Sequence, residues 1–230
     1  MDERPYRVGL LVPSSNTVME PDFVRELPAD VTVHSARMLL RDVTVEAEEV
    51  MLDDHALPAA EALGTLQPDV TVFGCTSAGA LLGHAAELAL TKRISLAAGS
   101  PVITVIQAIR GTLQRFGARR VGVVTPYSDV VTQRVVDSIA DMVDVVAVAN
   151  LGLVDNRVIG DTPPSHIAEF VVSRLGSAGA DAVFISCTNF RAVEALGQIS
   201  AALGVPVTSS NAAAIDAVLR HREQALQVAE

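Results

Sequence analysis

Aromatic residues are scarce in this sequence: Phe, Tyr and Trp together make up 3% of the 230 residues, and tryptophan is absent. Because half of the residues are nevertheless hydrophobic, the core must be built mainly from Val, Ala, Leu and Ile. Basic residues are also few, with 17 Lys and Arg against 27 Asp and Glu, so the formal net charge is −10. Nucleic acids and anionic membrane surfaces bind clustered positive charge, and this balance argues against both as partners.

Long hydrophobic runs are missing as well. No run of roughly 18 or more apolar residues occurs, so no membrane span is expected. The charged N-terminal segment, residues 1–7, leads directly into a strand pattern, and no secretory signal is visible. We therefore expect a cytoplasmic protein.

Cysteine is nearly absent too, with only Cys75 and Cys187, which lie 112 positions apart. Two such residues make no disulfide framework, and in a cytoplasmic chain they are expected to be free thiols. Each follows a short apolar strand pattern. We expect a helix to begin after Cys75, so that N–H groups of its first turn point at the sulfur and its dipole favours thiolate over thiol.

The sequence contains an internal repeat. Val8–Met19 aligns with Val121–Thr132 at an offset of 113, and the pair Cys75-Thr76 aligns with Cys187-Thr188 at an offset of 112. Each half has alternating strand and helix patterns, which predict a small parallel sheet with helices on both faces. We therefore predict an α/β fold with two four-stranded parallel sheets related by pseudo-two-fold symmetry.

The repeat also predicts the domain organisation. An N-terminal lobe would cover residues 1–110, with a C-terminal helix over 211–230 packed on it, and a second lobe would cover residues 111–210. Parallel sheets bind ligands at the carboxyl ends of their strands. The active site is therefore expected between the lobes, with one thiol on each wall.

Several local patterns add expectations. Val31–His34 should form a strand followed by a loop through Met38, and Asn150–Asp161 should be irregular. Glu46–Leu63 has helical spacing, with a break or kink predicted by Pro58. The acidic run at Glu46, Glu48 and Glu49 is expected to be a solvated helix face.

Five motifs in order along the chain resemble those of the aspartate/glutamate racemase superfamily. They are PSSNT (residues 13–17), GCTS (74–77), TPYSD (125–129), SCTN (186–189) and VTSSN (207–211). The PSSNT opening with Glu20 after it, and the HSARM segment (34–38), look most like the maleate cis–trans isomerase and arylmalonate decarboxylase branch. Arylmalonate decarboxylases keep only the second-half cysteine, so the presence of both favours isomerase or racemase chemistry.

The resemblance implies a cofactor-independent isomerase, without a metal, that converts a small unsaturated dicarboxylate from cis to trans, maleate to fumarate, and that forms a homo-oligomer. Rotation about a C=C bond requires the π bond to be broken, and a thiolate that adds to one alkene carbon makes that bond single. By resemblance, Cys75 would be the nucleophile. Cys187 would be the proton donor and acceptor, or the thiolate that faces the other carbon.

The same resemblance implies a set of substrate-binding residues. Asn16, Tyr127 and Asn156 would hold the two carboxylates by hydrogen bonds. Further donors are expected at the two helix starts, from Thr76, Ser77, Thr188 and Asn189. From residue type alone, Asn16 is equally a helix cap, Tyr127 a cover for an apolar edge and Asn156 a turn residue.

Two other functions remain open from the sequence. One is a racemase or epimerase of a small carbon acid such as aspartate, glutamate or a hydantoin, with the two thiols as acid and base on opposite faces. The other is a non-catalytic small-molecule binding module with two α/β lobes, which would have no need of matched thiols.

Overall fold

The first sheet is built around two buried strands, β1 (Tyr6–Pro13) and β3 (Val70–Phe73), in a computed structural model that describes residues 4–229. Both strands are apolar runs rich in β-branched residues, which is the pattern of a strand covered on both faces. The strands β2 (Val31–Met38) and β4 (Val102–Thr104) complete the sheet in the order β2-β1-β3-β4. All neighbouring strands are parallel.

The second sheet repeats this arrangement. Its strands are β5 (Arg120–Thr125), β6 (Asp144–Asn150), β7 (Ala182–Ile185) and β8 (Val207–Ser209). Their order is β6-β5-β7-β8, again with parallel neighbours, so β5 takes the place that β1 has in the first sheet. The predicted fold of two four-stranded parallel sheets is confirmed.

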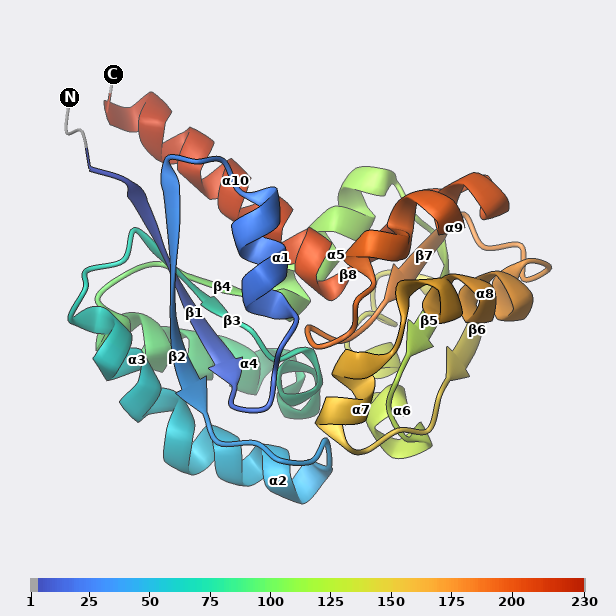
Figure 1. Cartoon of the computed structure of the whole chain (residues 1–230), viewed down its shortest axis with the longest axis horizontal. Coiled ribbons are helices and arrows are strands. Elements are labelled where there is room, and N and C mark those ends of the chain that lie inside the picture. Colours follow the sequence, from blue (N-terminus) through green and yellow to red (C-terminus); the bar gives the residue numbers. More distant parts are fainter. Residues whose placement is uncertain (1–3, 230) are drawn as a thin grey trace.

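Helices flank both sheets (Figure 1). In the first half these are α1 (Met19–Glu26), α2 (Val45–Val50), α3 (Ala56–Gly64), α4 (Thr76–Ala98) and α5 (Val105–Phe116). In the second half they are α6 (Asp129–Asp137), α7 (Asn156–Asp161), α8 (Pro164–Leu175), α9 (Leu196–Leu203) and α10 (Ser210–Ala229). None of the helices within residues 4–229 combines the length and the apolar character needed to cross a bilayer.

The last helix, α10, leaves the second sheet directly after β8 and packs against α5 and α1 (Figure 1). Helix α5 in turn contacts α4 and β4 of the first half as well as β8 of the second. Because these helices join the two halves, the domain boundary near residue 110 stays a prediction.

Two local expectations were wrong. The strand β2 continues to Met38, because each of its residues pairs with β1, from Tyr6–Val31 to Pro13–Met38. The polar side chains of His34 and Ser35 are exposed to solvent. An edge strand accommodates exposed polar side chains, so the strand continues through these two residues. Residues 156–161, expected to be irregular, form α7, whose first turn is capped by the side chain of Asp155.

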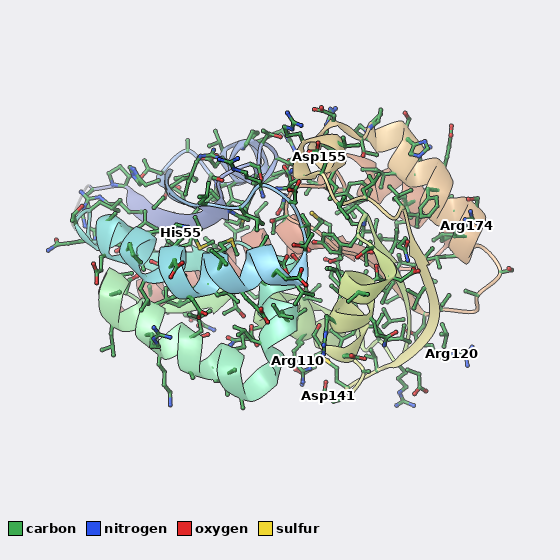
Figure 2. The ribbon with its side chains drawn as sticks, turned by 90° about the horizontal axis from the view of Figure 1, so that it is seen from below. His55, Arg110, Arg120, Asp141, Asp155 and Arg174 are labelled. Carbon is green, nitrogen blue, oxygen red and sulfur yellow. The ribbon has the colours of Figure 1, made fainter. Side chains whose placement is uncertain are left out.

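The break or kink predicted at Pro58 takes the form of a change in helix type just before it, without an interruption of the helix. A wider π turn, Met51–His55, separates α2 from α3, and the three segments follow one another along one helical rod that carries His55 (Figure 2). The ring of Pro58 crowds the carbonyl of Asp54, four residues earlier, and proline donates no hydrogen bond to it. The π turn lies where this contact falls.

Candidate active site

A small cavity lies at the junction of the lobes, and the two cysteines both line it. The structure brings all nine predicted site residues around this one space: Asn16, Cys75, Thr76, Ser77, Tyr127, Asn156, Cys187, Thr188 and Asn189. The apolar side chains of Leu40 and Val43 and the ring of Pro13 complete the wall. Among the side chains that the structure describes, which exclude that of His84, no group of three His, Cys, Asp or Glu is arranged to hold a metal ion.

The position of Cys75 follows from the strand before it. Strand β3 ends at Phe73, and Cys75 is the N-cap of α4, as predicted. A side chain at Gly74 would lie 2.6 Å from the sulfur of Met19 and 2.8 Å from the carbonyl oxygen of Leu11, so only glycine fits this turn. The backbone N–H of Ala78 in the first turn of α4 favours a thiolate at Cys75 and lowers its pKa.

The expected activation of Cys75 was wrong for this closed form of the site. The side chain is 4% exposed, and its burial raises the pKa of the thiol far above the ordinary value, an effect that the nearby charge of Glu48 increases. The nearby Ala78 backbone N–H and Ser77 hydroxyl group lower that pKa, but they do not offset the loss of solvation. Helix-start geometry alone therefore does not offset the effect of burial on the pKa of Cys75.

The surroundings of Cys187 differ from the predicted helix start. The chain forms a turn after β7, and the next helical segment is a short 3-10 helix at Val193–Ala195. The backbone of Cys187 has φ of 99°, a region that non-glycine residues rarely adopt and that commonly marks functional sites. Burial raises the pKa of its thiol to about 12. The hydrogen bonds from the Tyr127 hydroxyl and the Asn189 N–H lower this pKa, but their effect is smaller than that of burial.

The repeat suggested that Thr188 and Asn189 lie at a helix start, and the structure shows that they do not. Their side chains are used instead to join the lobes. The hydroxyl of Thr188 donates to the carbonyl of Gly74 at 2.9 Å, and the amide of Asn189 donates to the carbonyl of Asn156 at 2.6 Å. These bonds hold the turn in place without helical N–H groups.

The side chain of Asn16 stabilises the start of α1, in line with its helix-cap alternative, and its carboxylate-binding role stays a prediction. Its side-chain oxygen accepts the backbone N–H groups of Val18 and Met19, each at 3.0 Å, at the start of α1. Its amide group donates across the junction to the hydroxyl of Thr188 at 3.1 Å. The side chain is thus a fixed donor on the cavity wall, with its orientation set by the helix that it caps.

Ser210, which belongs to the VTSSN motif, connects the two cysteine turns. Its hydroxyl oxygen accepts the backbone N–H of Cys187 at 3.0 Å and the hydroxyl of Thr76 at 2.9 Å. The sequence placed this motif in the family pattern but assigned no role to Ser210. The sequence could have indicated a role for Ser210, because the motif lies at the end of the last strand. The end of that strand is at the same edge of the sheet as Cys187.

Two segments close the cavity over Leu40 and Val43. The N–H of Val43 donates to the carbonyl of Val154 at 2.9 Å, and Asp42 forms an isolated antiparallel bridge with Asp155. Asp155 lies at one edge of the junction between the lobes, and Arg110 and Asp141 lie at the opposite edge (Figure 2). The space open to the centre of a water-sized sphere is about 10 Å³, enough for about one water molecule. A four-carbon diacid is larger than this space.

Glu48 was assigned to a solvated helix face, and this was wrong. Its side chain is 1% exposed, whereas those of Glu46 and Glu49 point to solvent. The spacing in the sequence indicated that Glu48 would be buried. Glu48 precedes the buried Met51 and Leu52 by three and four residues, so it lies on the same face of the helix. The hydroxyl of Ser77 donates to its carboxylate, and burial raises the pKa of Glu48 to about 7.

Comparisons with known proteins agree with this geometry. The arylmalonate decarboxylase family model matches residues 8–229. The chain is 29% identical over 230 residues to a maleate isomerase of Geobacillus stearothermophilus, covering 94% of this chain and 91% of that one.

Two solved structures are similar over nearly the whole chain. The crystal structure of the maleate isomerase Iso from Pseudomonas putida S16 has a TM-score of 0.89 and 29% identity, covering 96% of this chain and 94% of that one. A cysteine-to-alanine variant of the same protein with maleate has a TM-score of 0.88 and 28% identity, covering 94% and 91%.

Proposed function

Since the chain belongs to the arylmalonate decarboxylase family, we propose from that premise that it is a cis–trans isomerase of a small unsaturated dicarboxylate, converting maleate to fumarate. One observation carries the assignment: a thiol from each lobe lines the same small cavity. A two-lobed binding module has no need of this pair. The relatives named maleate isomerases, similar over nearly the whole chain, support the same reaction.

The reaction proceeds by reversible addition of sulfur. The Cys75 thiolate forms a bond to one alkene carbon, and the π electrons move toward the neighbouring carboxylate, which becomes enediolate-like. The remaining carbon–carbon bond is single and rotates. The electrons then return to form the trans alkene, the sulfur–carbon bond breaks and the thiolate is released. Cys187, on the opposite wall, donates a proton to the second carbon and takes it back, or faces that carbon as a thiolate.

Neutral donors hold the dicarboxylate. No Lys or Arg is among the residues that line the cavity, so no fixed positive charge there quenches a nearby thiolate. Asn16, Tyr127 and Asn156 are placed to donate to the carboxylates once they leave their present partners. Further polar groups come from Thr76, Ser77, Thr188 and Asn189, which line the same cavity.

The test is fumarate formation from maleate, followed by proton NMR. Wild-type protein is expected to produce fumarate, and the Cys75→Ala variant is expected to produce none. A two-thiol racemase uses the same sulfurs as acid and base and forms no sulfur–carbon bond. Racemisation of aspartate or glutamate by a protein that leaves maleate unchanged would overturn the assignment.

The compartment and the assembly belong to this proposal as well. Both cysteines are free thiols, which supports a reducing compartment such as the cytoplasm. We propose a homo-oligomer, a dimer or a larger assembly. The exposed Leu88 and Leu96 on α4 support an apolar contact between copies, and light scattering coupled to size exclusion measures the assembly directly.

A further inference from the structure

A buried carboxyl group lies directly behind the first cysteine. Glu48 on α2 accepts a hydrogen bond from the Ser77 hydroxyl, and the oxygen of that hydroxyl lies 3.7 Å from the sulfur of Cys75. Ser77 lines the cavity and Glu48 does not. The three side chains therefore form a line that runs from the cavity into the wall between α2 and α4.

Among the side chains that the structure describes, which exclude that of His84, the carboxyl of Glu48 has no ion-pair partner and its one hydrogen-bonding side chain is Ser77. The titratable groups near enough to respond to its charge are Cys75, Cys187 and Tyr127, and that negative charge raises the pKa of each. The other carboxylates of its own helix, Glu46 and Glu49, are exposed. A buried, unpaired carboxyl is costly, and packing alone gives no reason for one at this position.

We propose that Glu48 is the proton acceptor for Cys75 and that Ser77 relays the proton between them. The inference rests on the proposed function, which requires a Cys75 thiolate. As the sulfur bonds to the alkene carbon, the Cys75 proton passes to the Ser77 oxygen and the Ser77 proton passes to the Glu48 carboxylate. The negative charge passes from the Glu48 carboxylate through the sulfur to the substrate, which becomes enediolate-like. When the sulfur–carbon bond breaks, the reverse transfer returns the proton to Cys75 and the charge to Glu48.

This arrangement solves the problem that the burial of Cys75 creates. A buried thiol that lost its proton to solvent would add a charge to the closed site. The relay instead moves a charge that is already there, so the total charge of the site stays constant. A carboxyl group with a pKa of about 7 both accepts and returns a proton at neutral pH, which suits a general base. Glu48 is thus a positioning and relay residue that acts through Ser77.

The central experiment is the Glu48→Gln variant, assayed for fumarate formation across pH 5 to 9. Glutamine has the same shape and its oxygen still accepts the Ser77 hydrogen bond, but it cannot take the proton. We expect kcat to fall by about 10²- to 10⁴-fold with little change in KM. We also expect kcat of the wild type to rise with pH through about 7, and this rise to be absent in the variant.

The matched control is Glu49→Gln, which removes the next carboxylate on the solvent side of α2 and should leave both rate and pH profile unchanged. A Glu48→Gln variant with lower KM and undiminished kcat would mean that the carboxylate only repels the dianion, and the proposal would be wrong. A slow variant that keeps the rise through pH 7 would also overturn it, since Glu48 would then be structural.

A second readout is independent of the substrate. Alkylation of Cys75 by iodoacetamide is expected to accelerate with an inflection near pH 7 in the wild type, and Glu48→Gln should remove that inflection. If it persists in the variant, the relay is excluded. If maleate is not isomerised but the inflection is present and Glu48-dependent, the proposed function fails while the relay stands.

Discussion

The hydroxyl of Tyr127 hydrogen-bonds the sulfur of Cys187, and both side chains are almost fully buried, at 1% and 4% exposed. Cys75 has a comparable neighbour in the hydroxyl of Ser77. Each lobe thus places one hydroxyl group beside its thiol. The two neighbours differ in what lies behind them, because Ser77 leads to the carboxyl of Glu48.

Replacement of Tyr127 by Phe should therefore impair the second cysteine specifically. Its hydroxyl lowers the pKa of Cys187, and a hydrogen bond to a charged group contributes about 1.5–3 kcal/mol. We expect fumarate formation to slow by roughly 10- to 100-fold, with the melting temperature nearly unchanged. The control is Tyr6→Phe, which removes a 2.6 Å hydrogen bond to His221 on residues that do not line the cavity. Equal loss of activity in both variants would contradict the role of Tyr127.

The turn before Cys75 should tolerate no side chain at Gly74. An added Cβ would meet Met19 at 2.6 Å and the carbonyl of Leu11 at 2.8 Å, so we expect Gly74→Ala to lower the free energy of unfolding by about 1–3 kcal/mol. The matched control is Gly197→Ala in α9, where an added Cβ meets nothing within 4 Å. That variant should be neutral or more stable by about 0.4–1 kcal/mol. Denaturant unfolding of both variants gives the comparison.

The pKa of Glu48 predicts a pH dependence of stability. It is raised from 4.5 to about 7 by burial, so the unfolded chain ionises first as the pH rises. The stability from the protonated carboxyl is complete below pH 4.5 and is lost as the pH rises to 7. The loss is on the order of 3 kcal/mol. Glu48→Gln should remove it, and the wild type and the variant should then differ more at pH 8 than at pH 4.5. An equal difference at both pH values would show that Glu48 does not titrate in this range.

Much of the fold could be predicted because it depends on local patterns that occur twice. The repeat around Val8–Met19 and Val121–Thr132 indicated two equivalent sheets. The length of β2 was missed because His34 and Ser35 are polar, and polar residues are compatible with an edge strand only once its partner is known. The helix at 156–161 is one short turn with a single capping residue, a signal too weak to separate from a loop.

The candidate site divides in the same way. Motif order was sufficient to bring eight of the nine predicted residues around one cavity, and Asn156, which lies in no motif, was assigned by the resemblance. The individual roles of all nine stay predictions. The pKa of Cys75 was misjudged because it depends on burial by distant segments such as residues 40–43, whereas the helix start is visible locally. Glu48 was missed because an acidic run usually faces solvent, and only its spacing to Met51 and Leu52 indicated otherwise.

The most direct test of the account is the mass of the Cys187→Ser variant after incubation with maleate. This variant should fold and lose most of its turnover, because the serine hydroxyl is a weaker acid than the Cys187 thiol that it replaces. We expect the mass of one maleate to be added to the peptide that contains Cys75, and no addition when Cys75→Ala is combined with Cys187→Ser. A Cys75 peptide that gains no mass, from a wild type that still converts maleate to fumarate, would contradict covalent addition by this cysteine.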